Sequence, residues 1–254
     1  MRVVLIGSGN TATVLGKLIV RADHEMLQVF SRQTNHAREL AAKLDCDFTT
    51  DLEMLRKDAD LYLVAIADNA LLNIESWLNT GRKLVMHTAG SVSMQVLEKV
   101  SMNFGILYPL QSLRKDLDEI PEVPLLIDAN TPENLALIED FARSLSQQVY
   151  HANDHQREST HLAAVIVSNF SNHLYTLAAD FCSKENLDFK MLQPLIEEVA
   201  TRLRSTSPNQ VQTGPAIRND LVTIEKHLNK LSAFPELQRF YQLFSEEIIH
   251  YYKK

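Results

Sequence analysis

The feature that most constrains this chain is an apolar run followed by small residues at fixed spacing, within its first twelve residues. Val3–Ile6 is typical of a buried strand, and Gly7, Gly9 and Ala12 follow it in the pattern Gly-x-Gly-x-x-Ala at the start of an amphipathic helix. The first glycine permits a tight turn, the second lets a pyrophosphate approach the backbone, and the small alanine lets the helix pack on the strand. Because the first N–H groups of a helix bind anions, we predict a dinucleotide site here; the alternative is a tight turn without a ligand. The expected contacts are Gly7, Ser8, Gly9, Asn10, Thr11 and Ala12.

The segment after the second predicted strand indicates which dinucleotide binds. That strand, Leu27–Phe30, leads into Ser31 and Arg32, where a site for NAD would carry Asp or Glu to bind the ribose 2′-hydroxyl. The next acidic residue is Glu39, inside the following helical pattern. A hydroxyl beside a guanidinium suits a 2′-phosphate, so the sequence predicts NADP as the cofactor. The alternative is that Arg32 is an ordinary exposed loop residue.

Composition excludes several classes of protein. The chain has 254 residues, of which 45% are hydrophobic and 22% charged, as in ordinary globular proteins. Its net charge of −7 argues against a nucleic-acid partner. Cys46 and Cys182 are far apart and show no ligand spacing, so we expect neither a disulfide framework nor a metal site. Without a long apolar run or a basic leader, no membrane span is expected, and the expected location is cytoplasmic.

Short apolar runs alternate with helical patterns over the first part of the chain. Continuous apolar runs are typical of strands covered on both faces, and their alternation with helices predicts an α/β fold with a doubly wound, mostly parallel, Rossmann-like sheet. The expected strands are Val3–Ile6, Leu27–Ser31, Cys46–Phe48, Leu61–Ala67, Lys83–Thr88, Phe104–Tyr108, Val123–Ile127 and Gln147–His151, and the helices between them include Thr34–Leu44 and Pro132–Ser146.

The pattern changes near Ala152, beyond which apolar residues recur every three or four positions. This spacing predicts an all-α C-terminal domain with helices at about 153–184, 188–204, 216–231 and 235–252. We therefore predict an NADP-binding domain over residues 1–152 and a helical substrate and dimerisation domain over residues 153–254. The length of the first helix, together with the apolar character of those that follow, predicts a homodimer.

Polar clusters follow three of the predicted strands, at the edge of a parallel sheet where ligands bind. His87 is titratable and is a candidate acid or base, with a structural histidine bonded to the backbone as the alternative. Tyr108 is expected to form a wall of the substrate pocket, with a role as proton donor as the alternative, and Gln111 is expected to orient the substrate. The residues expected to contact the cofactor here are Ala67, Asp68, Thr88, Ala89 and Gly90.

The long helix predicted after residue 152 carries a polar stripe. At about 100° per residue, its members lie within one arc of the helix. A helix that faces a cofactor can use such a stripe to hold a substrate, so we expect His161 and Asn169 to join the site. A solvated or interfacial face is the alternative. The stripe consists of His161, Val165, Ser168, Asn169 and Asn172.

A further cluster precedes the third predicted helix of the C-terminal domain. Thr213, Arg218 and Asp220 are candidates for the substrate site or for a subunit interface. Asp220 recurs with Thr223 and His227 on one helix face. The alternative for this cluster is a capped helix with a surface Asp–His pair.

These motifs, in this order, resemble a known family. It is the family of NADP oxidoreductases with an N-terminal Rossmann-like domain and a C-terminal helical domain of unknown function, and the resemblance covers nearly the whole chain. More distantly, the first domain is similar to pyrroline-5-carboxylate reductases and deazaflavin-dependent NADP reductases. The segments that carry the resemblance are Gly7–Ala12, Ser31–Arg32, His87–Gly90, Tyr108–Gln111, His161–Ala164, Ser168–Asn169, Thr213–Pro215, Arg218, Asp220 and His227–Leu228.

The resemblance implies an NADP-dependent oxidoreductase that transfers hydride between the nicotinamide and a small carbonyl or imine substrate bound between its two domains. The similar β-hydroxyacid dehydrogenases carry a catalytic lysine one turn before an asparagine. Here Val165 stands one turn before Asn169, and valine cannot transfer a proton. The alternative hypothesis is therefore a non-catalytic NADP-binding sensor or scaffold.

Overall fold

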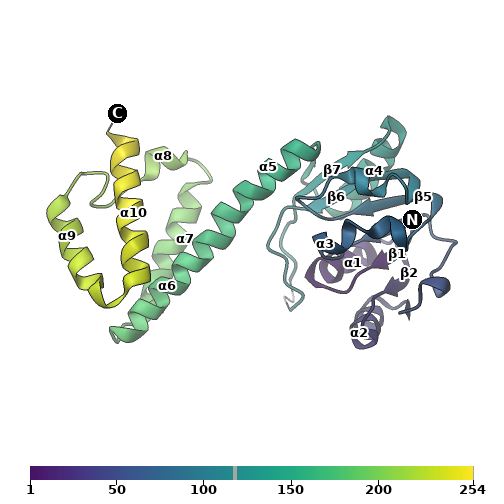
Figure 1. Ribbon diagram of the computed structural model, residues 1–254, viewed down its shortest axis with the longest axis horizontal. Coiled ribbons are helices and arrows are strands. Elements are labelled where there is room, and N and C mark those ends of the chain that lie inside the picture. Colours follow the sequence, from purple (N-terminus) through teal and green to yellow (C-terminus); the bar gives the residue numbers. More distant parts are fainter. Residues whose placement is uncertain (117–118, 254) are drawn as a thin grey trace. The chain divides into compact units, whose positions relative to one another are not determined.

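The computed structural model describes residues 1–116 and 119–253, and the chain divides into two compact units, Met1–Ser168 and Asn169–Lys254 (Figure 1). The first unit holds the sheet and the second is helical. The division lies inside the helical run that begins at Asp154, so the first turns of that run belong to the sheet unit. The predicted boundary near Ala152 marks the end of the last strand, and the predicted domain ranges stay a prediction.

The first unit is built on one eight-stranded sheet, with the order β3-β2-β1-β4-β5-β6-β7-β8. Neighbouring strands are parallel except β6 and β7, which pair antiparallel. The predicted doubly wound, mostly parallel sheet is therefore confirmed. The strands are β1 (Arg2–Ile6), β2 (Glu25–Phe30), β3 (Asp47–Thr49), β4 (Leu61–Val64), β5 (Gly81–His87), β6 (Ser101–Pro109), β7 (Leu125–Ala129) and β8 (Val149–His151).

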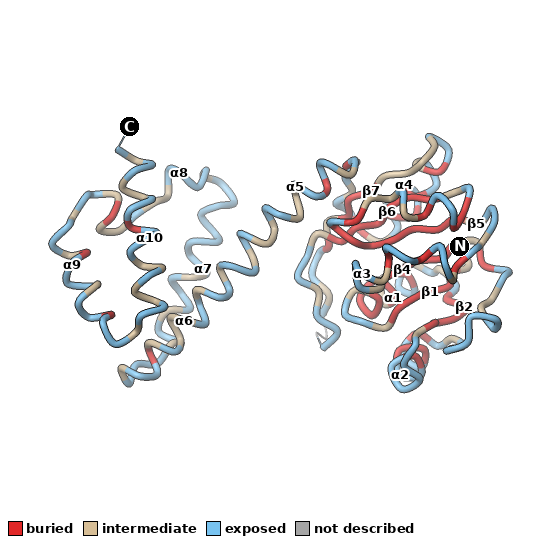
Figure 2. Tube along the Cα trace, in the orientation of Figure 1, coloured by how far each residue is buried: buried red, intermediate tan, exposed pale blue. Residues whose placement is uncertain are grey.

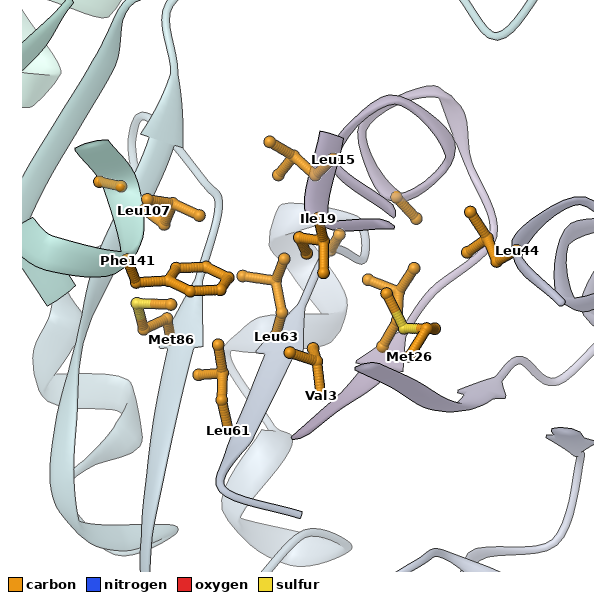
Figure 3. Packing of buried hydrophobic residues seen from close by; sticks show 14 of the residues in the cluster. Val3, Leu15, Ile19, Met26, Leu44, Leu61, Leu63, Met86, Leu107 and Phe141 are labelled. Atoms are coloured by element: carbon orange, nitrogen blue, oxygen red, sulfur yellow. The ribbon is translucent and has the colours of Figure 1, made fainter. Parts of the chain in front are cut away.

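Helices and short turns cover both faces of this sheet. The α-helices of the unit are α1 (Asn10–Arg21), α2 (Thr34–Leu44), α3 (Asp68–Leu71), α4 (Pro132–Leu145) and α5 (Asp154–Ala164), and the 3-10 turns are Leu52–Met54, Ile74–Ser76 and Met94–Leu97. Alternate strand residues supply the two cores, because successive side chains of a strand point to opposite faces. Thus Leu5 and Leu63 pack with Leu15 of α1, whereas Ile6 and Val64 pack with Leu71 of α3. Figure 3 shows the first of these clusters.

The fourth strand ends earlier than its apolar run suggests. Leu61–Ala67 is the predicted strand, but pairing stops at Val64, which lies opposite Ile6. From Ala65 the chain leaves the sheet, and Ala67 becomes the N-terminal cap of α3. The last residues of the apolar run therefore form a loop at the end of the sheet, which is the place where they are able to contact a ligand.

The long helix predicted over residues 153–184 is present as three consecutive segments. They are α5, a π-helical segment (Val165–Phe170) and α6 (Ser171–Lys184). A capping box begins the run: the Asn153 side chain accepts from the Gln156 N–H at 2.9 Å, and the Gln156 side chain accepts from the Asn153 N–H at 3.0 Å. The π-helical segment lies within the polar stripe, and such segments are frequent at functional sites.

The second unit is less deeply packed than the first. Buried residues are concentrated along the strands, whereas the helices from α6 onward are mostly intermediate or exposed (Figure 2). Of the predicted helices, the last is confirmed, and the third begins at Leu221 rather than at residue 216. The chain turns before that point, because Asn219 has a left-handed φ of 54° and Asp220 caps the helix. The elements are α6, a 3-10 turn at Phe189–Leu192, α7 (Gln193–Arg202), α8 (Pro208–Val211), α9 (Leu221–Lys230), a 3-10 turn at Leu231–Ala233 and α10 (Pro235–Tyr252).

Candidate functional site

A cavity of about 750 Å³ opens at the carboxyl ends of the parallel strands of the first unit. It is centred where the strand order reverses, between β1 and β4, which is the usual binding place of an open α/β sheet. The ends of β1, β2, β4, β5 and β6 all contribute to its wall. The predicted residues that line it are Gly7, Ser8, Gly9, Asn10, Thr11, Ser31, Arg32, Ala67, Asp68, Thr88, Ala89, Gly90, Tyr108 and His161.

The fold requires glycine at one of the two glycine positions after β1 and not at the other. Gly7 has a φ of +124°, and a Cβ there would lie 2.1 Å from the carbonyl oxygen of Ala65, so this position requires glycine for the fold itself. Gly9 has an extended backbone (φ −81°, ψ −169°) that any residue can adopt, and a Cβ there would meet no atom within 4 Å. The fold therefore leaves open space at Gly9, as expected where a ligand approaches the backbone.

The N-terminus of α1 borders the cavity and suits an anion. Gly9 is its cap and supplies no side-chain hydrogen bond, and no acidic residue occupies the first turn. The first N–H groups of the helix therefore have no side-chain cap, and the helix dipole favours negative charge at this end. Ala12 is fully buried and packs in the core below, so its part is to bring helix and strand together.

The end of β2 provides hydroxyl and guanidinium groups. The hydroxyls of Ser8 and Ser31 lie 2.8 Å apart, which joins the two strand ends. Arg32 is exposed beside them, and among the described residues no carboxylate lies within 4 Å of its guanidinium. Gln33 and His36 also line this part of the cavity, although the sequence analysis did not select them. These donors and the exposed Arg32 cation fit the 2′-phosphate of NADP.

An aromatic pair that the sequence analysis missed also lines the cavity. The rings of Phe30 and Trp77 are stacked with centroids 6.3 Å apart, and Leu52 lies in the same wall. Phe30 ends β2, directly before Ser31, but Trp77 comes from a loop between β4 and β5, where no pattern marks it. Trp77 is the single tryptophan of the chain, so its fluorescence can report on this cavity.

The loops after β4 and β5 meet through polar contacts. The Ser91 hydroxyl donates to the Asp68 carboxylate at 2.7 Å. A Cβ at Gly90 would lie 2.7 Å from the ring of His161, so glycine at this position allows the α5 imidazole to lie against the loop. Gly90 is therefore required for packing against His161, a residue far along the chain.

The imidazole of His161 forms the most directed contact of the cavity wall. The Tyr108 hydroxyl at the end of β6 lies 2.8 Å from Nδ1 of His161, and the two rings pack edge to face. Tyr108 is only 8% exposed, and burial raises the pKa of its hydroxyl. The sequence analysis selected both residues but gave no reason to pair them.

The structure corrects the prediction for His87, which does not line the cavity. The side chain is fully buried: Nδ1 accepts from the Ala89 N–H at 3.2 Å, and Nε2 lies 3.3 Å from the carbonyl oxygen of Ser93. A carbonyl can only accept, so Nε2 carries the hydrogen of a neutral ring. Burial, with the charge of the nearby Arg157, lowers the pKa of His87 to about 4. This is the structural histidine that the sequence analysis kept as the alternative.

Two other predicted catalytic residues also lie outside the cavity wall. Gln111 is exposed, and its side chain accepts from the Ser112 N–H at 3.0 Å. Asn169 is exposed on the π-helical segment and belongs to the second unit. Within the first unit, however, the hydroxyls of Ser112 and Ser168 lie 2.8 Å apart, so the stripe contacts the loop after β6 at Ser168 as well as Tyr108 at His161.

The cluster around residue 220 has a local role in the second unit. The Asp220 carboxylate accepts from the N–H and the hydroxyl of Thr223, which caps α9 and lowers the pKa of Asp220. Thr213 and Arg218 are exposed. His227 contacts the Tyr241 hydroxyl at 2.7 Å rather than Asp220. The capped helix that was kept as the alternative is therefore present.

Two further features concern the described residues as a whole. Across residues 1–116 and 119–253 no three His, Cys, Asp or Glu side chains are grouped so that they could hold a metal ion. Within the same ranges, none of the helices has the length and apolar character needed to cross a membrane.

Two known families match different parts of the chain. Residues 2–87 match a family described as NADP oxidoreductase, coenzyme F420-dependent, and residues 123–248 match a domain of unknown function, DUF2520. Among curated proteins, none matches this chain.

Solved structures show similarity over the whole chain. A Bacteroides fragilis protein assigned as an NADP oxidoreductase is 41% identical, with a TM-score of 0.91 and 98% of each chain covered. Pyrroline-5-carboxylate reductase from Streptococcus pyogenes shares the fold at 14% identity, with a TM-score of 0.65 and 98% of each chain covered. An imine reductase from Myxococcus stipitatus, solved in complex with NADP⁺, does so at 15% identity, with a TM-score of 0.61, 100% of this chain and 93% of that one.

Proposed function

Because this chain belongs to the family of NADP oxidoreductases that join a coenzyme F420-dependent-type NADP domain to a DUF2520 domain, we propose that it transfers hydride between NADP and a small carbonyl or imine compound. The observation that carries the proposal is the cavity at the switch point of the sheet. It joins the N-terminus of α1, the exposed guanidinium of Arg32 and the hydrogen-bonded Tyr108–His161 pair in one wall.

Each part of NADP has a matching group in this wall. The N–H groups at the start of α1 bind the pyrophosphate, and the open space at Gly9 lets it approach the backbone. Ser31 and Arg32 bind the 2′-phosphate, since a guanidinium can donate two parallel hydrogen bonds to phosphate oxygens. The rest of the wall, at the ends of β4, β5 and β6, would then hold the nicotinamide, where Tyr108 and His161 lie.

The chemistry is divided between the cofactor and the protein. Reduced NADP supplies the hydride, whereas the protein orients the substrate and holds the proton that a carbonyl oxygen or imine nitrogen must receive. An imine suits a chain with Val165 in the place of a lysine, because a protonated imine needs less acid assistance than a ketone. That the substrate binds between the two domains stays a prediction, as does the cytoplasmic location.

Family membership favours an enzyme over a sensor or scaffold. The argument for a sensor is the missing lysine, which removes one way to move a proton. The pairing of Tyr108 with His161 answers that argument, because it provides ionisable groups at the cavity wall without a lysine.

Fluorescence of Trp77 tests the cofactor, and NADPH oxidation tests the reaction. Tryptophan emission overlaps NADPH absorption, so binding beside Trp77 should quench the single tryptophan. We expect saturable quenching by NADPH and oxidation of NADPH with members of a panel of small ketones and cyclic imines. Saturable binding with no oxidation across the panel would favour the sensor instead.

We also propose that the protein is a homodimer formed by its helical domain. Met191, Leu195, Val199 and Leu203 recur every fourth residue along α7 and its ends, and they are between 46% and 75% exposed. Monomers rarely expose such contiguous apolar surface, and a second copy of the chain would cover it.

Light scattering tests the assembly. It should give twice the chain mass of 28.8 kDa, and Leu195→Lys should restore the mass of one chain while leaving NADPH binding by the first unit intact. The matched control is Leu72→Lys, an exposed leucine of the first unit, which should stay dimeric. A wild-type mass of 28.8 kDa would refute the homodimer.

A further inference from the structure

We propose that the Tyr108 hydroxyl donates the proton that accompanies hydride transfer, and that His161 replaces this proton. The proposal rests on the proposed hydride transfer and adds the group that balances it. When hydride reaches the carbon of a C=O or neutral C=N bond, negative charge develops on the oxygen or nitrogen. A positioned acid that protonates this atom typically accelerates such a step by about 10²–10⁴-fold.

Few groups of the cavity wall can serve as this acid. Its ionisable side chains, among the described residues, are Arg32, His36, Asp68, Tyr108 and His161. Arg32 and His36 follow β2, at the end that fits the 2′-phosphate. Asp68 accepts from the Ser91 hydroxyl and, as a carboxylate, has no proton to give. Tyr108 and His161 remain, and they lie beside Gly90, at the ends of β5 and β6.

A hydrogen bond between the two residues, the docking of α5 and packing against Gly90 hold the pair in place. The Tyr108 hydroxyl lies 2.8 Å from Nδ1 of His161. One turn earlier on α5, the buried Arg157 donates to the carbonyl of Val92 at 2.6 Å and to the Asp154 carboxylate at 2.7 Å, which fixes the helix against the loop after β5. The ring of His161 then fills the space that a side chain at Gly90 would need.

Burial keeps Tyr108 protonated. Burial is the largest effect and raises the pKa of Tyr108. The Asp68 carboxylate raises this pKa further, and the Arg157 cation lowers it. A hydroxyl that holds its proton at neutral pH is a donor rather than a base. His161 is only half-buried, so its imidazole can exchange protons with water.

The step balances as a relay of one proton and one hydride. The carbonyl carbon accepts hydride from the reduced cofactor and forms a C–H bond, while the C=O π bond breaks. The oxygen takes the Tyr108 proton, and Tyr108 takes the Nδ1 proton of the His161 imidazolium. The products are an alcohol, the oxidised cofactor and a neutral imidazole, which water protonates again. For an imine the same relay protonates nitrogen and gives an amine.

Three probes with one ring size separate proton supply from the shape of the pocket. Cyclopentanone needs a proton, whereas the N-methyl iminium ion of 2-methyl-1-pyrroline accepts hydride without one. The parent 2-methyl-1-pyrroline is partly protonated in neutral water and needs a proton from the protein only in its neutral form. With saturating NADPH, Tyr108→Phe should lower kcat for cyclopentanone by about 100-fold or more, lower it less for the pyrroline, and leave the rate with the iminium ion within about threefold. Tyr150→Phe, at an exposed tyrosine of β8, is the matched control and should change none of the rates.

His161→Gln tests the replacement step with the same probes. The variant should be about tenfold slower than the wild type with cyclopentanone. Its rate with the iminium ion, which needs no proton, should stay within about threefold of the wild type. Binding of NADPH, followed by Trp77 quenching, should change by less than about twofold in both variants.

The outcomes are distinguishable. Equal losses with all three probes, or a larger loss for His161→Gln than for Tyr108→Phe, would overturn the relay while leaving hydride transfer in place. A wild-type protein that oxidises NADPH with none of the probes would overturn the proposed function, and the relay with it.

Discussion

Replacement of Gly9 by alanine should weaken cofactor binding while leaving the stability of the protein nearly unchanged. The backbone at Gly9 is extended, with φ −81° and ψ −169°, and an added Cβ would meet no protein atom within 4 Å. Alanine therefore fits the folded chain and restricts the unfolded one, which contributes about 0.4–1 kcal/mol of stability. Because Gly9 is the N-cap of α1, and alanine is a poorer N-cap than glycine by a similar amount, the two effects offset each other. The Tm should therefore change by less than about 4 °C.

The same methyl group occupies the space through which the pyrophosphate approaches the start of α1. Displacement of the phosphate by the methyl removes at least one charge-assisted hydrogen bond, worth about 1.5–3 kcal/mol. A loss of this size weakens NADPH binding by at least about tenfold. The fold thus tolerates a methyl group at this residue, whereas the cofactor does not.

The assay pairs thermal unfolding with titration of Trp77 fluorescence by NADPH. Gly7→Ala is the control, because at Gly7 a side chain does not fit the fold. Its Cβ would lie 2.1 Å from the Ala65 carbonyl oxygen, and the φ of Gly7 is +124°. That variant should lose stability as well as binding. If Gly9→Ala binds NADPH within about threefold of the wild type, the pyrophosphate does not approach this backbone and the reasoning is wrong.

Two further predictions concern Arg32 and His87. Arg32→Ala should reduce the preference for NADPH over NADH by about tenfold or more, since one charge-assisted contact to the 2′-phosphate is lost. Arg38→Ala, at a residue outside the cavity wall, is the control and should keep the preference. Equal preference in the wild type and Arg32→Ala would refute the assignment. The pKa of His87 is about 4 in the folded protein, below the ordinary value of 6.5, so the unfolded chain binds the proton more readily and stability falls as pH drops between these values, by roughly 3 kcal/mol in all. His87→Asn should make the loss of Tm between pH 6.5 and 4 smaller, and an unchanged slope would contradict the neutral buried ring.

Local backbone geometry explains why the cofactor half of the site was predictable. Gly7 and Gly9 lie within a few residues of β1, and Ser31 and Arg32 directly follow β2. Parallel strands with reversing order bring these ends together whatever the remaining sequence does, because ligands of such sheets bind at the switch point. The confirmed cofactor, NADP, follows from that local reading.

His87 was selected because it ends a strand of a parallel sheet, without regard to the face of the sheet toward which its side chain points. His87 ends β5, but it lies two residues after Val85 and therefore points to the same face, where Val85 belongs to a buried core. The loop after β5 covers this face and its Ser93 carbonyl bonds the ring. Leu84, Val85 and Met86 are all buried, on alternating faces, so the sequence of β5 alone does not show that the following loop closes over His87.

No sequence pattern could pair Tyr108 with His161, since 53 residues separate them. Their contact depends on how α5 docks on the sheet, and that docking is fixed by a buried Arg157, which has no periodic signature. The one local trace is Gly90, whose missing side chain makes room for the imidazole. A glycine after a strand end can thus mark a distant partner as well as a phosphate.

The missing lysine and the Tyr–His pair are connected through the helix that carries both positions. Val165 lies one turn after His161, so the ionisable group of this helix is displaced by one turn toward its N-terminus. At that position the imidazole of His161 reaches the end of β6 and contacts the hydroxyl of Tyr108. In the proposed mechanism α1 and β2 bind the phosphates while β6 and α5 supply the proton, so the two functions rest on separate elements. Gly9→Ala should therefore weaken binding and leave the Tyr108–His161 bond intact, and Tyr108→Phe should remove proton supply and leave binding intact. A variant of either kind that disturbed both would mean that the cavity acts as one unit.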